Sequence, residues 1–241
     1  MKVIRLDLHQ NNAVYRNPTS GEIVETYPLV PPSTILGLIS TLLKKELENN
    51  CFNISIQGNY GSLMRDYQWY KKYDEEIEGY KNKPYPLLVH SLFDNKLLLH
   101  ICVQDQEDTS TLNLLYNMLK NPPYFLYLGR AEDIVKINEI KIVDVQKEEV
   151  SESQYLQYDA YLSIKDATTL KISGIEYNLT SYSKLLSWTI NNQTKIIRDF
   201  NWVNVFYIEK GSMIEIEQDS NIRCWKDGEN FIWWCLPNPP Q

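Results

Sequence analysis

The chain has 241 residues, of which 43% are hydrophobic and 23% are charged, proportions that are ordinary for a folded soluble protein. Its net charge of −7 argues against nonspecific binding of polyanions, so any contact with nucleic acid must be local. No apolar run approaches the ~18 residues of a membrane span. The N-terminus alternates apolar and charged side chains, unlike a signal peptide. We therefore expect a cytoplasmic protein that does not contact a membrane.

The cysteines and the familiar sequence motifs indicate neither a metal nor a cofactor. The four cysteines are widely spaced and form no CxxC pair, which argues against a zinc site or a disulfide framework and favours free thiols. The sequence contains no phosphate-binding GxxxxGK[ST] loop, no HExxH and no GxSxG. We therefore expect no metal site and no cofactor.

The first two predicted elements are a strand and a helix. Apolar side chains alternate over residues 3–8, which is the period of a strand. Apolar side chains at helical spacing predict a helix over residues 33–47, capped at its start by Ser33 or Thr34.

The elements that follow predict an α+β fold. They are a short strand at 54–57, a polar and aromatic insertion at 60–84, strands at 87–93 and 96–104 joined by a turn at Asp94-Asn95, a helix at 109–120 and a strand at 124–128. This order, β-α-β, insertion, β-β-α-β, is typical of a ferredoxin-like domain with one added strand. We assign the domain to residues 1–148.

A smaller, mainly-β C-terminal lobe is predicted for residues 149–241, after an acidic linker at 146–154. Its predicted strands lie at 161–164, 169–172, 202–209, 213–216 and 231–235. Ferredoxin-like folds host many functions, so the function has to be argued from candidate sites.

The first candidate site is the start of the helix at 33–47. A proline-rich segment delivers the chain rigidly to this helix N-terminus, where free amides and the hydroxyls of Ser33 and Thr34 would meet an anion. Gly37 would let another backbone approach the first turn. The alternative is a capped helix with a glycine placed for packing.

The second candidate site is Gly129-Arg130, at the end of the strand predicted at 124–128. Glycine permits a positive φ and the close approach of a phosphate, and the arginine fork suits phosphate oxygens. The alternative is a turn in which Arg130 pairs with an acid such as Glu132.

The third candidate site is the insertion at 60–84, which mixes cations and flat rings as proteins that hold single-stranded nucleic acid do. Its candidate contacts are Arg65, Trp69, Lys71 and Lys72. The alternative is an aromatic anchor packed on the C-terminal lobe.

Catalysis by histidine is not favoured. Metal-independent RNA cleavage needs a general base and a general acid, but His9, His90 and His100 do not cluster in the sequence and are more typical of structural histidines. We assign no catalytic residue. Base stacking on the sheet face is not expected either, because Arg5, Asp7 and His9 share one face of the first strand.

Three segments stand out by their order and spacing: the first strand with residues 15–18 (YRNP), residues 26–37 (TYPLVPPSTILG) and residues 122–133 (PPYFLYLGRAED). They resemble the CRISPR-associated family numbered five, within the repeat-associated mysterious protein (RAMP) superfamily. The likeness covers residues 1 to about 145. It points to the type I-B or I-A branch, in which a separate endonuclease processes the precursor RNA.

The resemblance implies a ferredoxin-like domain of the RAMP/RRM-like kind. It also implies a non-catalytic subunit of a type I interference (Cascade) complex, which binds the 5′ handle of the guide RNA and nucleates the backbone filament in antiviral defence. The insertion would be a thumb near the handle–spacer junction, close to target DNA, and the Cascade backbone subunit and large subunit would be protein partners. By motif position, the RNA contacts would be Arg16, Ser33, Thr34, Gly129 and Arg130, with Arg65, Trp69, Lys71 and Lys72 in the thumb.

Two other functions stay open. One branch of the family cuts precursor guide RNA itself, and a metal-independent endoribonuclease of that kind would use His90 or His100 as acid or base. The other possibility is an assembly scaffold whose RNA contacts are incidental.

Overall fold

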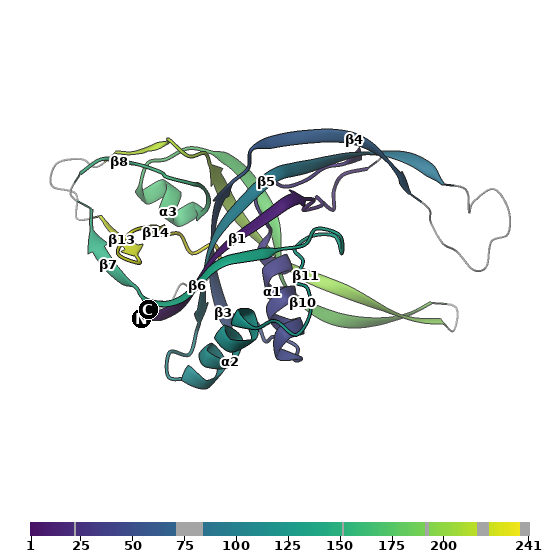
Figure 1. Cartoon of the computed structure of the whole chain (residues 1–241), viewed down its shortest axis with the longest axis horizontal. Helices are drawn as coiled ribbons and strands as arrows, with labels where there is room; N and C mark the ends of the chain where they lie inside the picture. The colour runs from purple at the N-terminus through teal and green to yellow at the C-terminus, as the bar shows by residue number, and fades with distance from the viewer. Residues whose placement is uncertain (22, 71–83, 151, 191–192, 216–221, 237–241) are drawn as a thin grey trace.

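The computed structural model describes residues 1–241 except 22, 71–83, 151, 191–192, 216–221 and 237–241. Within these ranges its main feature is a nine-stranded sheet with three helices beside it (Figure 1). The predicted α+β class is confirmed. No helix in the described ranges is long and apolar enough to cross a membrane.

The elements alternate irregularly along the chain. The strands are β1 (Lys2–Ala13), β2 (Ile23–Val24), β3 (Phe52–Asn59), β4 (Ser62–Tyr70), β5 (Tyr85–Val103), β6 (Lys136–Asp144), β7 (Gln146–Glu149), β8 (Gln154–Tyr155), β9 (Asp159–Ser163), β10 (Ile175–Ile190), β11 (Gln193–Ile208), β12 (Met213–Ile214), β13 (Arg223–Lys226) and β14 (Phe231–Ile232). The helices are α1 (Pro32–Leu43), α2 (Thr109–Lys120) and α3 (Ile164–Thr169).

The nine-stranded sheet has the order β10-β11-β9-β3-β5-β1-β6, and β2 and β4 also pair with β5. Its pairings are antiparallel except that of β2 with β5. Strand β9 joins β3 on one side and β11 on the other. The sheet therefore contains strands from both sides of residue 148, while the domain division at that residue stays a prediction.

One face of the sheet packs against α1 and α2. Strand β1 alternates as predicted and turns Ile4, Leu6 and Leu8 into a buried cluster that also contains Ile39 of α1 and Leu115 of α2. Each such side chain contributes roughly 1.5–3 kcal/mol when it is removed from water. The apolar period of the first strand thus places both helices on the same side of the sheet.

The other face of the sheet is partly covered by the C-terminal segment 223–236. Arg5 of β1 makes ion pairs with Asp227 (3.3 Å) and Glu229 (3.1 Å), and Trp234 forms a backbone bridge with Ser55 of β3. The protein's own chain therefore occupies part of the surface on which a conventional RNA recognition motif stacks bases.

The strands predicted at 87–93 and 96–104 are one continuous strand, β5, so the turn predicted at Asp94-Asn95 is wrong. Asp94 has a φ of 51°, and the buried amide of Asn95 donates a hydrogen bond to the Tyr15 hydroxyl at 2.8 Å. The strand is therefore irregular at this point without reversing. Strands β3 and β4 pair along it in succession, so the insertion predicted at 60–84 begins as β4.

Two other predicted strands are wrong. Residues 124–128 form a loop in which the Phe125 side chain is 85% exposed and an isolated bridge joins Tyr127 to Ile134. Strand β6 takes the place beside β1 instead. Residues 169–172 include the last residue of α3 and the turn after it, not a strand.

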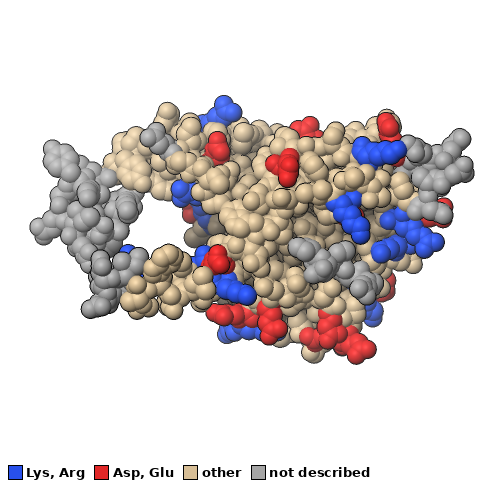
Figure 2. Space-filling model, turned by 180° about the vertical axis from the view of Figure 1, so that it is seen from behind, with Lys and Arg blue, Asp and Glu red and all other residues tan. Residues whose placement is uncertain are grey.

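Two long hairpins project from the same side of the body (Figure 1). One, the β4–β5 arm, consists of β4 and the first half of β5. The other, the β10–β11 arm, consists of the second half of β10 and the first half of β11, which pair with each other. Seen from behind, Lys and Arg side chains are interspersed with Asp and Glu on the face shown in Figure 2. The described part of this face therefore carries no continuous basic surface, and a nucleic acid would have to be held at local sites.

Candidate nucleic-acid interface

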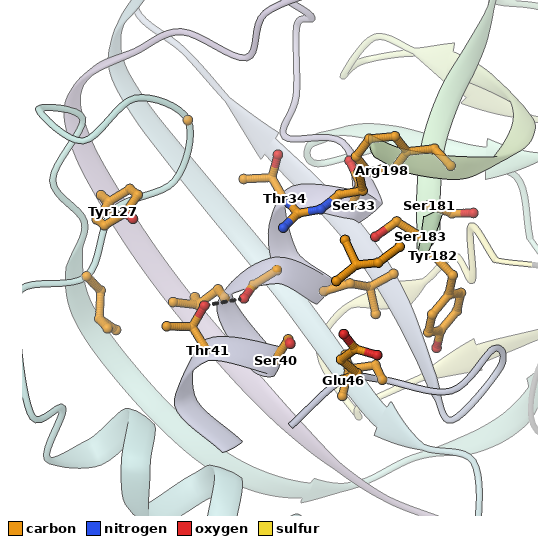
Figure 3. A pocket seen from close by; sticks show the side chains of 18 of the residues that line it. Ser33, Thr34, Ser40, Thr41, Glu46, Tyr127, Ser181, Tyr182, Ser183 and Arg198 are labelled. Atoms are coloured by element: carbon orange, nitrogen blue, oxygen red, sulfur yellow. Dashed lines mark hydrogen bonds between the residues drawn. The ribbon is translucent and has the colours of Figure 1, made fainter. Parts of the chain in front are cut away.

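A groove of about 560 Å³ lies between α1, the loop at 124–129 and the base of the β10–β11 arm (Figure 3). It brings together three of the predicted site residues, Ser33, Thr34 and Gly129. Its other hydroxyl-bearing lining residues are Ser40, Thr41, Tyr124, Tyr127, Ser181, Tyr182 and Ser183. The groove therefore has many groups that can donate to or accept from a nucleotide.

The C-terminal strands hold the start of α1. The Tyr161 hydroxyl of β9 donates to the Leu29 carbonyl at 3.0 Å, and Pro31 is the extended N-cap residue, with a ψ of 151°. The predicted side-chain cap is wrong, because this N-cap makes no side-chain hydrogen bond and the Ser33 hydroxyl lies 2.6 Å from that of Thr180 in β10. The first turn of α1 borders the groove, but it offers fewer free amides than the sequence analysis expected. Pro31 and Pro32 have no N–H, and the Thr34 N–H donates to the Pro31 carbonyl at 3.0 Å, so the Ser33 N–H is the one left for a ligand in this turn.

Arg198 of β11 also lines the groove, and no sequence motif had indicated it. In Figure 3 its side chain extends toward Ser33 and Thr34. Its cross-strand partner Leu185 lines the groove as well. The strand predicted from residue 202 begins nine residues earlier, at Gln193, so no strand pattern pointed to Arg198 as part of a site.

Gly129 has the positive φ expected of it, 101°, but its close neighbour belongs to the protein. A Cβ atom at this position would lie 2.6 Å from the carbonyl oxygen of Val14, at the end of β1. The glycine is therefore required for the loop to pack against β1. A contact between its backbone and a phosphate stays a prediction.

Arg130 is engaged by an acid, as the alternative interpretation proposed. Its guanidinium binds both carboxylate oxygens of Asp133, at 3.0 and 3.2 Å, and donates to the side-chain oxygen of Gln68 in β4 at 2.8 Å. A second ion pair joins it to Glu132 at 3.3 Å. Burial disfavours the charge, but these hydrogen bonds outweigh it and raise the pKa of Arg130. Arg130 therefore ties the loop to the β4–β5 arm, and its RNA contact stays a prediction.

Arg16 is exposed, and its backbone forms a bridge with Thr26. It is not among the residues that line the groove within the described chain. The structure thus separates Arg16 from Ser33, Thr34 and Gly129, and its role as a handle contact stays a prediction.

The β4–β5 arm presents two of the predicted thumb residues on one face. Arg65 and Trp69 are four residues apart in β4, which puts both side chains on the same side of the strand. The Trp69 side chain is 73% exposed. Lys71 and Lys72 lie outside the described residues.

The comparison with protein families decides the identity. The family model described as CRISPR-associated protein (Cas_Cas5) matches residues 3–205, which is most of the chain. The chain belongs to the Cas5 family. The resemblance predicted from residues 15–18, 26–37 and 122–133 is thereby confirmed, and no curated protein matches the chain.

Solved structures similar to this Cas5-family chain have low sequence identity to it. One, described as a "CRISPR RNA-guided surveillance complex", has a TM-score of 0.53 and 12% identity, covering 86% of this chain and 91% of that one. Another, a CRISPR protein from Archaeoglobus fulgidus, has a TM-score of 0.46 and 10% identity, covering 96% of this chain and 98% of that one. At these identities the first likeness shows a shared fold.

The three histidines of this Cas5-family chain lie in different surroundings. His9 hydrogen-bonds Asp94 at 2.9 Å, His90 lies opposite Arg65 in the β4–β5 arm, and the fully buried His100 hydrogen-bonds Asp227 at 3.0 Å. His90 and His100 are ten residues apart in one strand, roughly 30 Å along an extended chain. These two histidines therefore do not form one acid–base pair.

Proposed function

We propose that the chain is the non-catalytic subunit of a type I CRISPR interference complex and that its groove binds the 5′ handle of the guide RNA. The observation that carries the proposal is the presence of Ser33, Thr34 and Gly129 around one groove. These residues come from two of the three segments in which the family resemblance was found. They are separated by almost a hundred positions in the sequence, and the fold brings them together.

The chemistry of the groove supports RNA as its ligand. RNA is recognised at single-stranded ends through phosphates, base edges and 2′-hydroxyls, and hydroxyl-rich walls can donate to and accept from all of these. The start of α1 favours negative charge through its dipole and the N–H of Ser33. Arg198 adds a permanent positive charge that suits a phosphate.

The arrangement of the sheet supports a ferredoxin-like (RAMP/RRM-like) core. Four of its strands follow the order β6-β1-β5-β3, with α1 between β1 and β3 in the chain and α2 between β5 and β6. This is two β-α-β units whose strands alternate in one antiparallel sheet. The β4–β5 arm continues outward from the paired strands β3 and β5. It would be the thumb at the handle–spacer junction, near target DNA.

Within this proposal the chain works in the cytoplasm and nucleates the backbone filament, with the backbone subunit and the large subunit as neighbours. The likeness to a structure described as a "CRISPR RNA-guided surveillance complex" is consistent with such an assembly. The acidic surplus of the chain, −7 overall, suits contact with basic protein partners while the RNA contacts remain local.

Co-purification tests the proposal. The chain would be expressed with its neighbouring genes and a repeat–spacer array, purified through a tag on this subunit, and the bound RNA sequenced. Guides that share one 5′ handle are the expected result, and an assembled complex without RNA would overturn the proposal in favour of a scaffold.

A cleavage assay tests the remaining alternative, an endoribonuclease. The pure chain would be incubated with repeat RNA without added metal, and a discrete cut that His90→Ala or His100→Ala abolishes would establish an endoribonuclease instead.

A further inference from the structure

The β10–β11 arm carries a second surface with the composition of a nucleic-acid site. In an antiparallel pair, residues directly opposite each other share a face. Trp188 lies opposite Lys195, Leu186 opposite Ile197 and Lys184 opposite Asp199. These six residues form one face of the arm, which we call the Trp188 face. Leu185 and Arg198, which line the groove, belong to the opposite face.

The Trp188 face is exposed and apolar at its centre. The Trp188 side chain is 58% exposed, and Leu186 and Ile197 beside it are exposed as well. Exposure of an indole ring to water costs free energy. A large exposed ring on a projecting hairpin therefore marks a surface that binds a ligand.

The charge of the Trp188 face indicates what it binds. Lys184 and Lys195 supply two cations against the single carboxylate of Asp199, whereas the chain as a whole carries a net charge of −7. Among the described residues, neither lysine forms an ion pair with a carboxylate. A flat ring beside a cation is the combination that stacks an unpaired base and neutralises its phosphate.

The β4–β5 arm repeats the same pattern. There Arg65 and Trp69 lie on one face of β4, also exposed and also on a hairpin that leaves the body on the same side. Two arms with the same combination of tryptophan and cation, far apart in the sequence, point to one kind of ligand.

We propose that the Trp188 face binds single-stranded nucleic acid, by stacking a base on Trp188 and placing the adjoining phosphate at Lys195. Stacking uses the flat face of a base, which RNA and DNA share, so this surface binds both. The site is separate from the groove and goes beyond handle binding, because it lies on the other face of the arm.

Oligonucleotide binding to the full-length chain tests the inference. Fluorescence anisotropy would compare labelled oligouridine and oligothymidine of equal length, with Trp188→Ala as the variant and Ile196→Ala as the control, since Ile196 is 71% exposed on the opposite face of the same arm. Loss of one stacking contact should weaken binding of both probes roughly tenfold, and the control should stay within about twofold. Lys195→Ala should reduce the slope of log K against log salt by about 0.7 for one phosphate. Equal binding by Trp188→Ala and the unaltered chain would overturn the inference.

A photo-crosslinker in the assembled complex provides an independent measurement. With p-benzoylphenylalanine in place of Leu186, irradiation should attach nucleic acid to the arm. A crosslink to a protein subunit alone would instead assign the Trp188 face to a protein contact and overturn the inference. If the complex retains handle-bearing guides but this position crosslinks no nucleic acid, the inference fails while the proposed function stands. If this position crosslinks nucleic acid but the complex holds no handle-bearing guides, the inference stands while the proposed function fails.

Discussion

The guanidinium of Arg130 and the carboxylate of Asp133 form a two-pronged ion pair, with Nη2–Oδ1 at 3.0 Å and Nε–Oδ2 at 3.2 Å. The Asp133 side chain is 1% exposed, and the Arg130 side chain 18%. The same carboxylate accepts hydrogen bonds from the backbone N–H groups of Val14 and Arg130, each at 3.0 Å. One buried acid thus joins the end of β1 to the loop that lines the groove.

Removing this acid should destabilise the fold. Asp133→Ala leaves a half-buried guanidinium and two backbone donors without their acceptor, so we expect the free energy of unfolding to fall by about 3 kcal/mol. Glu132→Ala is the matched control, because Glu132 pairs with the same arginine but is largely exposed, and it should cost less than about 1 kcal/mol. Urea unfolding of both variants measures the difference, and similar costs for the two would contradict this assignment.

Gly129 should not tolerate a side chain. In Gly129→Ala the new Cβ meets the Val14 carbonyl at 2.6 Å and also suffers the strain of a φ of 101°, so we expect a loss of about 2 kcal/mol or more. Gly211→Ala isolates the strain, since Gly211 has a φ of 82° and no atom within 4 Å of the place its new methyl group would take, and should cost about 1 kcal/mol. Thermal unfolding compares them. A smaller cost at position 129 than at 211 would show that the contact with Val14 is unimportant.

Acidification should weaken the attachment of the C-terminal segment to the sheet. Burial lowers the pKa of His100 below its ordinary 6.5. Although burial alone would raise the pKa of Asp227, hydrogen bonds from His100 and from the amides of Asn230 and Glu229 hold it below its ordinary 3.8. For both groups the unfolded chain takes up protons first as the pH falls, so stability is lost from about pH 6.5 downward for His100 and from about pH 4 downward for Asp227.

The variant His100→Gln tests this pH dependence. Stability measured by urea unfolding between about pH 7.5 and pH 5 should fall in the unaltered chain and fall less in His100→Gln. His9→Gln, at a partly exposed position in the neighbouring strand, controls for the loss of a histidine and should keep the decline. If stability fell with pH as steeply in His100→Gln as in the unaltered chain, the neutral His100 side chain would not be what holds the C-terminal segment.

Arginine substitutions should weaken retention of the guide. Arg198→Ala removes the cation of the groove, and we expect handle binding to weaken by about 1.5–3 kcal/mol if one charge-assisted contact is lost. Arg16→Ala should cost about 1–3 kcal/mol on the same grounds. Lys141→Ala, on the exposed surface of β6, is the control. Binding of a labelled handle RNA gives the three affinities, and unchanged affinity in Arg198→Ala or Arg16→Ala would remove that residue from the site.

A larger side chain at position 37 should weaken RNA binding in the groove without lowering the stability of the fold. Gly37 lines the groove in α1 and has no atom within 4 Å of the place a Cβ would take, so Gly37→Ala should stabilise the helix by up to about 1 kcal/mol. Gly37→Leu should fold equally well but reduce the space for the handle. Circular dichroism and handle binding measured on both variants test this, and full RNA affinity in Gly37→Leu would place the RNA elsewhere.

The elements that could be predicted from the sequence are those with one regular apolar face packed against the core. Helix α2 was predicted with its observed bounds, 109–120, and strand β1 was found because its alternate residues face α1 and α2. Helix α1 ends at Leu43, before the predicted 47, because Lys44 adopts a left-handed φ of 52° that a simple apolar period does not reveal.

The errors occur where distant contacts decide the structure. Residues 124–128 are a short aromatic and apolar run of the kind found in strands, but the adjoining loop is held instead by Asp133, which accepts a hydrogen bond from the Val14 N–H. Ser33, Thr34 and Gly129 were selected from separate motifs and do meet at the groove. Arg198 reaches the same groove because the base of the β10–β11 arm lies against α1, as the contact between Ser33 and Thr180 shows. These segments are far apart in the sequence, so no local pattern predicts that they meet.

The most direct test of the central claim is to map where the handle touches the chain. Guides carrying 4-thiouridine in the 5′ handle would be assembled into the complex and irradiated, and the crosslinked peptides identified by mass spectrometry. Handle binding in the groove predicts crosslinks to residues 33–41, to 124–129 or to the strand around Arg198. Crosslinks confined to the opposite face of the sheet, around Asp7 and His9, or to other subunits alone, would contradict it.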